Sequence, residues 1–353
     1  MKKSHIACLA CSTALAGSAL GCAPATAAGP MTRLVRPGGS IQKAVDAAKP
    51  GDTVLLSAGT YRESIRVTTS GLTLRGMGPN TVIEPAAGPA SNACAKAGNG
   101  ICVEGKAGHP VDDTTVTALT LSGFAKNGLW SSWTDRLTVR QVTAEKNKQW
   151  GIAQERSTRG VFLDNTARDN GDAGLFLANM VSTEGGAIDT RGAVIARNRL
   201  QGNRVGVTVR RLRDLTVTGN DITGNCAAVF VVGDENSPRG GALTVSDNTI
   251  HKNNKFCPKT ARLPFLQGSG IVLTGAESTL VTRNTITDNA GTSPLSGGVV
   301  LFKSMVGVPN ERNQISGNTL LHNTPADLVN ADPGKGNTFL ANSCRASKPA
   351  GLC

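Results

Sequence analysis

Two hexapeptides decide the fold of this 353-residue sequence: NRLQGN at 198–203 and NDITGN at 220–225. In both, an asparagine is followed by any residue, an apolar residue, two further residues and a second asparagine. The pattern returns at 248–253, 284–289, 318–323 and 337–342, and weaker forms end at Asn127, Asn147 and Asn170. The shortest intervals between closing asparagines are near 22 residues, as from Asn203 to Asn225. The chain is therefore an array of repeats of that length, with insertions in the longer intervals.

Each repeat contains three apolar clusters, which in one unit are 206–209, 215–217 and Ile222. Their alternation with period two is typical of strands with one buried face. Asparagine tolerates left-handed backbone angles, so we expect it at the corner between strands. Stacked turns would place these side chains about 4.8 Å apart, where their amides can hydrogen-bond along the stack. The repeats predict a single all-β domain, a parallel β-helix of about 10–11 turns.

A short helix is expected before the first turn. Ser40 is a suitable N-cap, and Ile41, Ala44, Val45 and Ala48 form one apolar face. The segment 49–51 (KPG) ends the helix. Because the open end of such a coil must be covered, we expect this helix to cap the first turn.

The same region carries a family resemblance. The segments IQKAV at 41–45, PGDTV at 50–54 and GTYRE at 59–63 resemble the entry segment of the pectin lyase-like right-handed parallel β-helix superfamily. The asparagine-marked repeats resemble the repeats of the same group, so the resemblance covers 38–344. It implies a right-handed coil. It does not define the activity, because the superfamily includes polysaccharide lyases, hydrolases, uronan epimerases, phage tailspikes and non-catalytic accessory proteins.

The N-terminus has the features of an export signal. Lys2 and Lys3 precede an apolar stretch at 6–20, and a small-residue cleavage site follows at 25–27. We expect a signal peptide at 1–27, a linker at 28–37, the β-helix at 38–344 and a tail at 345–353. Alternatively, Cys22 after Gly21 resembles a lipobox, which would make 1–21 a lipoprotein signal and Cys22 a membrane anchor. No stretch is long enough to predict a transmembrane helix, and the mature protein is expected outside the cell.

The cysteines agree with export. Three lie in or beside the signal, and the six others are Cys94, Cys102, Cys226, Cys257, Cys344 and Cys353. Six cysteines allow 15 pairings. Sequence proximity favours Cys94–Cys102, Cys226–Cys257 and Cys344–Cys353. A zinc site is disfavoured because these six contain no Cys-x-x-Cys pair, and the scarcity of histidine and methionine argues against copper handling.

The net charge of +12 favours acidic partners such as a uronate polysaccharide or a cell-wall polymer. A generally basic, soluble surface is the alternative interpretation. Nucleic acid is disfavoured, since no dense run of Lys and Arg with interleaved aromatics occurs. We expect a monomer.

The resemblance implies a groove along the outer face of the first strand of each turn. Inward residues are expected near Leu129, Ile152, Leu175, Val207, Val229, Ile271 and Val299. The outward neighbours are then Trp130, Ala153, Phe176, Thr208, Phe230, Val272 and Val300, and a second outward row runs from Ser132 through Glu155 and Arg210 to Phe302. We expect substrate contacts from Trp130, Glu155, Phe176, Phe230 and Lys303. The alternative is that insertion loops cover the aromatic rings.

Catalysis, where present, is expected to be lyase-type elimination. It needs a base and a cation that neutralises the uronate carboxylate. Arg210 or Arg211 is the candidate base or clamp, because related lyases use such residues, and Asp234 with Glu235 is a candidate Ca²⁺ site. A solvated ion-pair cluster is the alternative. The Gly-His-Gly and Asp-Pro-His-Asp signatures of related hydrolases and epimerases are missing. The sequence therefore predicts an exported protein that binds or cleaves an acidic polysaccharide, or alternatively a non-catalytic surface or accessory module.

Overall fold

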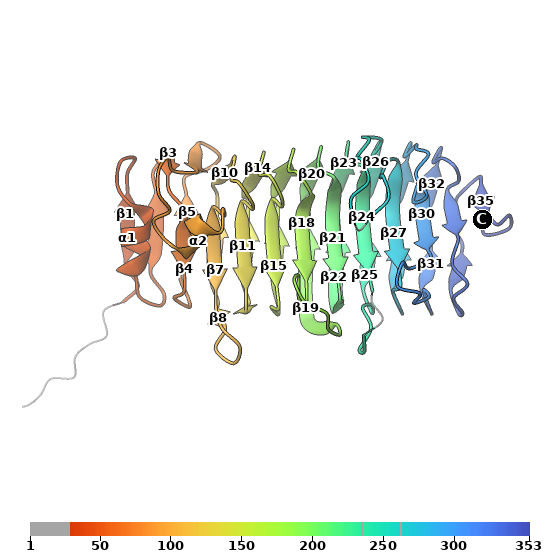
Figure 1. Ribbon diagram of the computed structural model, residues 1–353, viewed down its shortest axis with the longest axis horizontal. Coiled ribbons are helices and arrows are strands. Elements are labelled where there is room, and N and C mark those ends of the chain that lie inside the picture. Colours follow the sequence, from red (N-terminus) through yellow and green to blue (C-terminus); the bar gives the residue numbers. More distant parts are fainter. Residues whose placement is uncertain (1–28, 234–235, 262) are drawn as a thin grey trace, which may run out of the picture.

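A computed structural model of the protein describes residues 29–233, 236–261 and 263–353. The predicted signal peptide and Cys22 lie outside this range, as do Asp234 and Glu235. The strands stack as the rungs of a single coil whose long axis runs from β1 to β35 (Figure 1). Within the described residues, no helix is both long and apolar enough to cross a membrane.

Three parallel sheets form the faces of the coil. Sheet A has 12 strands: β1 (Thr32–Val35), β2 (Thr53–Leu56), β5 (Thr73–Gly76), β9 (Thr115–Thr117), β13 (Thr138–Arg140), β16 (Val161–Leu163), β19 (Ile188–Ala196), β22 (Leu212–Thr218), β25 (Thr244–Ser246), β28 (Leu280–Thr282), β31 (Gln314–Ser316) and β34 (Thr338–Leu340). Sheet B has 10 strands: β3 (Gly59–Arg62), β6 (Thr81–Glu84), β10 (Thr120–Ser122), β14 (Thr143–Glu145), β17 (Thr166–Arg168), β20 (Arg199–Gln201), β23 (Asp221–Thr223), β26 (Thr249–His251), β29 (Thr285–Thr287) and β32 (Thr319–Leu321).

Sheet C has 11 strands and faces the viewer in Figure 1: β4 (Ile65–Val67), β7 (Ile101–Glu104), β11 (Leu129–Ser132), β15 (Ile152–Glu155), β18 (Ala173–Ala178), β21 (Val205–Arg210), β24 (Ala227–Val232), β27 (Ser269–Thr274), β30 (Gly297–Phe302), β33 (Leu328–Asn330) and β35 (Ser347–Lys348). A small pair is formed by β8 (Val111–Asp112) and β12 (Thr134–Asp135). The predicted all-β parallel β-helix is confirmed, and the strand numbers agree with the expected turns.

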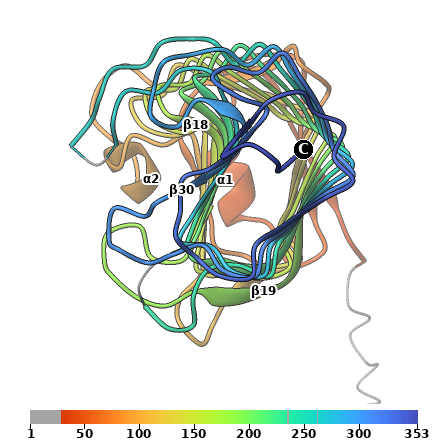
Figure 2. The same ribbon diagram turned by 90° about the vertical axis from the view of Figure 1, so that its right-hand side faces the viewer.

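Both ends of the coil are covered. Helix α1 (Ile41–Asp46) buries Ile41 and Val45, and the hydroxyl of Ser40 accepts a hydrogen bond from the backbone N–H of Lys43. Viewed end-on, α1 lies within the outline of the coil (Figure 2). The helix ends two residues before Ala48, although Ala48 is still buried. At the other end, the chain folds back through β35 and partly buries Leu352 against the core. A second short helix, α2 (Ala93–Lys96), lies beside sheet C.

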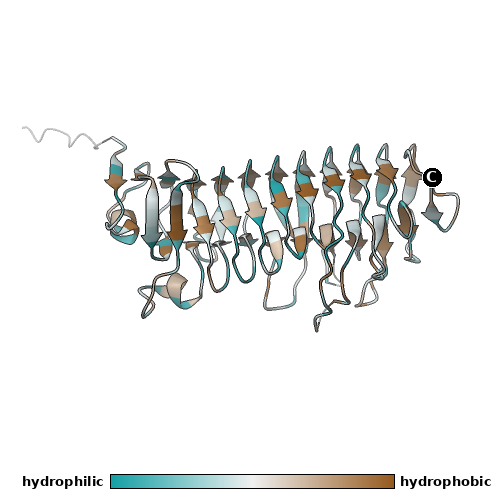
Figure 3. Ribbon diagram, turned by 90° about the horizontal axis from the view of Figure 1, so that it is seen from above, coloured by the Kyte–Doolittle hydropathy of each residue, from teal (hydrophilic) through white to brown (hydrophobic). Residues whose placement is uncertain are grey.

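Two segments expected outside the coil contribute strands to it. Strand β1 lies within 28–37, which the sequence suggested as a linker, and pairs in parallel with β2. Strand β35 lies within the expected tail and pairs with β33. Hydrophobic positions recur on successive strands, as the brown segments of Figure 3 show. These recurring side chains fill the interior of the coil.

The asparagines form two long internal ladders. In the first, the Nδ2 amides donate along the series at 2.9–3.0 Å, from Asn165 through Asn198, Asn220, Asn248, Asn284 and Asn318 to Asn342. The second runs at 2.9–3.1 Å from Asn147 through Asn170, Asn203, Asn225, Asn253 and Asn289 to Asn323. The predicted amide stacking is confirmed, and the two asparagines of one hexapeptide belong to different ladders.

Two details of the repeat differ from expectation. The left-handed backbone angle belongs to the residue before the asparagine, such as Asp247 before Asn248 and Arg283 before Asn284. The asparagine itself is needed because its side-chain amide forms the hydrogen bonds of the ladder. In addition, the hexapeptide at 337–342 flanks β34 of sheet A, whereas the other copies flank strands of sheet B. Its closing Asn342 therefore joins the ladder of the opening asparagines, because the hydrogen bonds that it accepts come from Asn318.

Three disulfides join the cysteines expected from sequence proximity. The Cα–Cα distances are 5.7 Å for Cys94–Cys102, 6.0 Å for Cys226–Cys257 and 5.4 Å for Cys344–Cys353. Each closes a local loop or the C-terminal end. The predicted pairing is confirmed.

Candidate functional site

The outer face of sheet C carries the predicted rows of side chains in the predicted register. Leu129 pairs with Ile152 and Ile152 with Leu175, and this register continues through Val207, Val229 and Ile271 to Val299. All seven are fully buried in the interior. Their neighbours therefore point outward, as expected.

Much of that outward row is covered. Phe176 and Phe230 are only 7% and 4% exposed. They belong to an outer cluster, a second hydrophobic cluster made by sheet C with residues of the loops above it, among them Trp150, Cys257, Leu266 and Leu295. The insertion loops thus fill the centre of the expected groove, and neither ring presents an open face to a sugar.

An aromatic stack lies at the N-terminal end of this face. Trp150 stacks on Phe176 with ring centroids 4.0 Å apart, and Trp130 stacks on Trp150 at 6.1 Å. Trp130 is half-buried. The indole N–H of Trp150 donates to the carboxylate of Asp172 at 3.1 Å. Burial raises the pKa of the Asp172 carboxyl, and this hydrogen bond opposes the rise.

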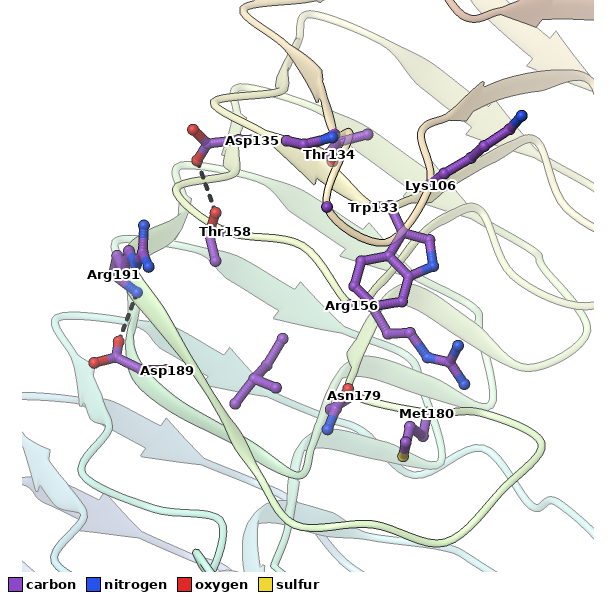
Figure 4. Close-up of a pocket in the computed structure, with 13 residues that line it drawn as sticks. Lys106, Trp133, Thr134, Asp135, Arg156, Thr158, Asn179, Met180, Asp189 and Arg191 are labelled. Carbon is purple, nitrogen blue, oxygen red and sulfur yellow. Dashed lines mark hydrogen bonds between the residues drawn. The ribbon is translucent and has the colours of Figure 1, made fainter.

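A cleft of about 820 Å³ opens at the margin between sheets C and A. Residues that follow the strands of sheet C form one wall and residues of β19 in sheet A form the other. The volume of the cleft is within the usual range for small-molecule sites. The lining residues are Lys106, Gly108, Pro110, Trp133, Thr134, Asp135, Arg156, Thr158, Asn179, Met180, Ile188, Asp189 and Arg191. Figure 4 shows Trp133 and Arg156 on one side and Asp189 with Arg191 on the other.

Trp133 and Arg156 occupy equivalent corner positions of neighbouring turns. Each follows directly after its strand and has a positive φ, of 51° and 49°. The equivalent corner residues of the next two turns are Asn179 and Arg211. The backbone N–H of each corner residue donates to the carbonyl of the residue before the next corner, as from Arg156 to Ala178. The guanidinium of Arg156 lies 5.5 Å from the centroid of the Trp133 ring. This cation–π contact holds both side chains at the cleft.

The segment 179–187, which we call the strap, crosses the margin of the coil beside the cleft. The carboxylate of Glu155 accepts a hydrogen bond from the N–H of Val181 at 2.6 Å. Arg211 donates to the carbonyl of Thr183 at 2.8 Å and pairs with Glu184. The strap is therefore fixed by two side chains that the sequence had assigned to substrate chemistry.

A bulge in β19 forms the opposite wall. The register between β19 and β22 shifts between Asp189 and Ala193, because two extra residues lie in β19. Arg191 and Gly192 have positive φ angles of 54° and 81° there. Bulges redirect side chains at the rims of sheets, and this one places Asp189 and Arg191 in the lining of the cleft.

The charges of the cleft are unevenly compensated. Asp135 accepts hydrogen bonds from Arg159 at 2.8 Å, Thr158 at 2.7 Å and Arg136 at 2.9 Å. The hydrogen bond from Arg159, with those of Thr158 and the nearby arginine charges, lowers the pKa of Asp135 despite its burial. Asp135 is thus a firmly ionised structural anion and a poor general base. The exposed cations Lys106 and Arg191 remain for a ligand, whereas the half-buried Arg156 also lies 3.8 Å from the carboxylate of its neighbour Glu155.

The candidate residues from the sequence are dispersed. Arg210 ends β21, half-buried, opposite Ala178 and Val232. Arg211 is only 1% exposed beneath the strap. Lys303 is exposed and lies three turns further along the same margin. The structure brings Glu155 and Arg211 together at the strap and does not bring Lys303 to them.

Sequence reasoning had not assigned Lys106, Asp189 or Arg191 to a site. The one sequence feature that points to this cleft is that Trp133 and Arg156 directly follow equivalent strands of neighbouring turns. The positions of Asp189 and Arg191 depend on the bulge, which the repeat pattern does not encode.

Two family models match the chain. A model described as right-handed beta helix region matches residues 80–239, and one described as periplasmic copper-binding protein (NosD) matches residues 179–344. No curated protein matches the sequence.

The residues of the described part do not fit a copper centre. Copper in proteins is held mainly by imidazole and sulfur ligands. All six described cysteines are in disulfides. Across 29–233, 236–261 and 263–353, no three His, Cys, Asp or Glu side chains gather as a metal site would require. The Ca²⁺ site expected at Asp234 and Glu235 lies outside the described residues and gains no support from those around it.

Solved structures with similar folds include several carbohydrate-active proteins. The A-module of the Azotobacter vinelandii mannuronan C-5 epimerase AlgE4 has a TM-score of 0.57 and 19% identity, covering 86% of this chain and 89% of that one. DFA-IIIase from Arthrobacter chlorophenolicus A6 has a TM-score of 0.56 and 12% identity, and the match covers 87% of this chain and 92% of that one. A double mutant of the periplasmic alginate epimerase AlgG has a TM-score of 0.54 and 13% identity, and the match covers 90% of this chain and 75% of that one.

At these identities the likeness establishes the fold alone. It agrees with the stacked parallel sheets, the asparagine ladders and the entry segment. On these grounds the chain has the right-handed parallel β-helix fold.

Proposed function

We propose that this protein works outside the cytoplasm and binds an anionic oligosaccharide in the cleft between sheets C and A. The observation that carries the proposal is the pairing of Trp133 with Arg156 in the cleft wall, opposite Arg191. An indole can pack on the apolar C–H face of a sugar ring, and a guanidinium binds carboxylate or sulfate groups. Three disulfides support an oxidising compartment.

Acidic sugars are favoured over neutral ones by the charge of the site. Asp135 is already bound by two arginines, so it repels a ligand carboxylate weakly. Lys106, Arg156 and Arg191 come from different segments around the cleft. The chain as a whole carries +12, which attracts anionic polymers. The names of AlgE4 and AlgG include mannuronan and alginate, polymers of uronic acids, and this supports testing uronates first.

The proposal is tested by titration calorimetry with uronate oligosaccharides and with neutral oligosaccharides of the same length. Arg156→Ala should weaken uronate binding by about 1.5–3 kcal/mol, because a charge-assisted hydrogen bond is lost. Trp133→Ala should weaken it by about 1–2 kcal/mol through lost apolar contact.

The matched control is Arg283→Ala. It removes an arginine that pairs with Asp247 on another corner of the coil, so binding should stay unchanged. Equal binding by wild type and both cleft variants, or equal affinity for neutral sugars, would exclude the cleft as an acidic-sugar site.

Cleavage by elimination is the second candidate, and Arg210 is its best-placed residue. Arg210 is half-buried at the end of β21, whereas Arg211 is held beneath the strap and would need the strap to move. Incubation with uronate polymers should then produce ultraviolet absorbance from unsaturated products. Arg210→Ala should abolish that signal without changing uronate affinity in the cleft. Absence of any signal from wild type would leave binding as the function.

A further inference from the structure

The segments 253–261 and 263–267 lie between β26 and β27 and form a projection that we call the Phe256 loop. Residue 262 lies outside the described residues and is not part of this definition. The Cys226–Cys257 disulfide ties the loop to the start of β24. Cys257 and Leu266 exchange two backbone hydrogen bonds of 2.9 Å, and Arg204 donates to the carbonyl of Pro258 at 2.8 Å. In the end-on view of Figure 2 this teal loop reaches outward on the same side of the coil as α2, although Figure 1 shows that the two lie at different places along the long axis.

The loop presents an aromatic ring to solvent. Phe256 is 59% exposed and is the one aromatic residue among the exposed large hydrophobics of the described chain. Its ring centroid lies 5.7 Å from that of Phe265, at a tilt of 31°. Because Phe256 adjoins Cys257, the disulfide fixes its place on the projection.

Three lysines lie close to Phe256 in the sequence. Lys252, Lys255 and Lys259 are all exposed. The sequence contains no Asp or Glu between Asp247 and Glu277. The loop is therefore an exposed aromatic projection inside an acid-free, basic stretch.

We propose that the Phe256 loop docks the protein on a membrane surface that contains anionic lipids. Phe256 would enter the boundary between headgroups and acyl chains, and the lysines would contact lipid phosphates. The proposal is independent of the function assigned to the cleft, because the loop enters sheet C at the start of its strands and the cleft lies at their ends.

The geometry favours a lipid surface over a sugar polymer. Polysaccharides bind along grooves whose walls contact successive rings. Phe256 instead stands on a projection, with its neighbour Phe265 tilted and no flat aromatic row beside it. A soft interface can enclose such a projection from all sides.

Vesicle co-sedimentation tests the proposal, with Cys22→Ser as the background so that no acyl chain at that position contributes. Vesicles of phosphatidylglycerol mixed with phosphatidylcholine should bind the protein, and vesicles of phosphatidylcholine alone should bind it less. Phe256→Ser should weaken binding about tenfold. Lys252→Glu with Lys259→Glu should weaken it at least tenfold and remove its dependence on salt. Lys255 is left intact because its ammonium donates to the carbonyl of Gly202.

Leu340→Ser is the matched control, because Leu340 is 56% exposed on β34 at the far end of the coil. It should bind vesicles as wild type does. The proposal fails if wild type ignores both kinds of vesicle, or if Phe256→Ser and Leu340→Ser behave alike. It also fails if Phe256→Ser affects only retention on an anionic polysaccharide column, which would reassign the loop to polymer binding.

Discussion

The asparagine side chain satisfies buried backbone groups at each corner of the coil. Asn220 is 1% exposed. Its Nδ2 donates to Asn248 at 2.9 Å and to the carbonyl of Ile195 at 3.1 Å, and its Oδ1 accepts from the backbone and side chain of Asn198. No other short side chain offers both a donor pair and an acceptor in this shape. The left-handed angle sits one residue earlier, at Gly219, and a non-glycine residue in the equivalent place costs about 1 kcal/mol.

Asn220→Ala should therefore lower the free energy of unfolding by about 2–4 kcal/mol, since several buried partners lose their bonds. Asn342→Ala should cost about 1–2 kcal/mol, because Asn342 is half-buried and ends its ladder, where its Nδ2 donates to the carbonyl of Ile315 and not to a further asparagine of the described chain. Urea denaturation followed by circular dichroism measures both. Equal losses would mean that the ladder is not the main source of the stability.

Asp135 gives the fold a dependence on acid pH. Its pKa is lowered in the folded state, mainly by the hydrogen bond from Arg159. The stabilisation is present above its unfolded pKa of about 3.9 and is lost as the pH falls through the folded value. Asp135→Asn should cost about 1–2 kcal/mol at neutral pH and flatten the fall of Tm below about pH 4.

Asp247→Asn is the comparison for that pH profile. Asp247 also pairs with an arginine that lowers its pKa, but its side chain is 44% exposed. Solvent screens such a pair, so the change should cost at most about 0.5 kcal/mol. A Tm profile that moves equally in both variants would contradict the assigned role of Asp135.

At the level of the strands, β19 makes the cleft by departing from the repeat. Deleting Arg191 and Gly192 removes the two extra residues and should restore regular pairing between β19 and β22. We expect stability to change by no more than about 1 kcal/mol, because no interior side chain is lost. Uronate affinity should fall at least tenfold, since Arg191 leaves the cleft and Asp189 is re-aimed. Retained affinity in titration calorimetry would exclude the bulge from the site.

The contrast between strands and insertions explains what could be predicted from the sequence. Alternation and asparagine spacing placed Leu129, Ile152 and the following inward residues in correct register, because a slip of one residue would expose every apolar side chain. The same pattern does not distinguish 337–342, which flanks a strand of sheet A, from the other copies, which flank strands of sheet B. A hexapeptide of this pattern suits the corners of both sheets. The strap and the Phe256 loop follow no period, so their paths over sheet C could not be inferred. For that reason the groove was expected where the loops in fact pack.

The whole molecule is a solenoid, and its stability depends on both ends being closed. Each turn contacts only its neighbours, so an open end exposes interior side chains and unpaired strand edges. At the C-terminus, the loop closed by Cys344–Cys353 carries Leu352, which packs with Phe339 against the core. We therefore expect this disulfide to have a second role besides stability, which is to keep one coil from stacking on another.

Replacing Cys344 and Cys353 with serine should open this end, and the comparison is the same replacement at Cys94 and Cys102 beside sheet C. The two disulfides close loops of similar length, with separations of 9 and 8 residues, so each variant should lose about 2–3 kcal/mol. Only the first should associate, because it frees the terminal strands for pairing with a second coil. Light scattering over a concentration series would show a rising mass for the Cys344 and Cys353 variant and a constant mass for the other. Association of both variants to the same degree would instead trace it to lost stability, and the end of the coil would then have no special part in preventing association.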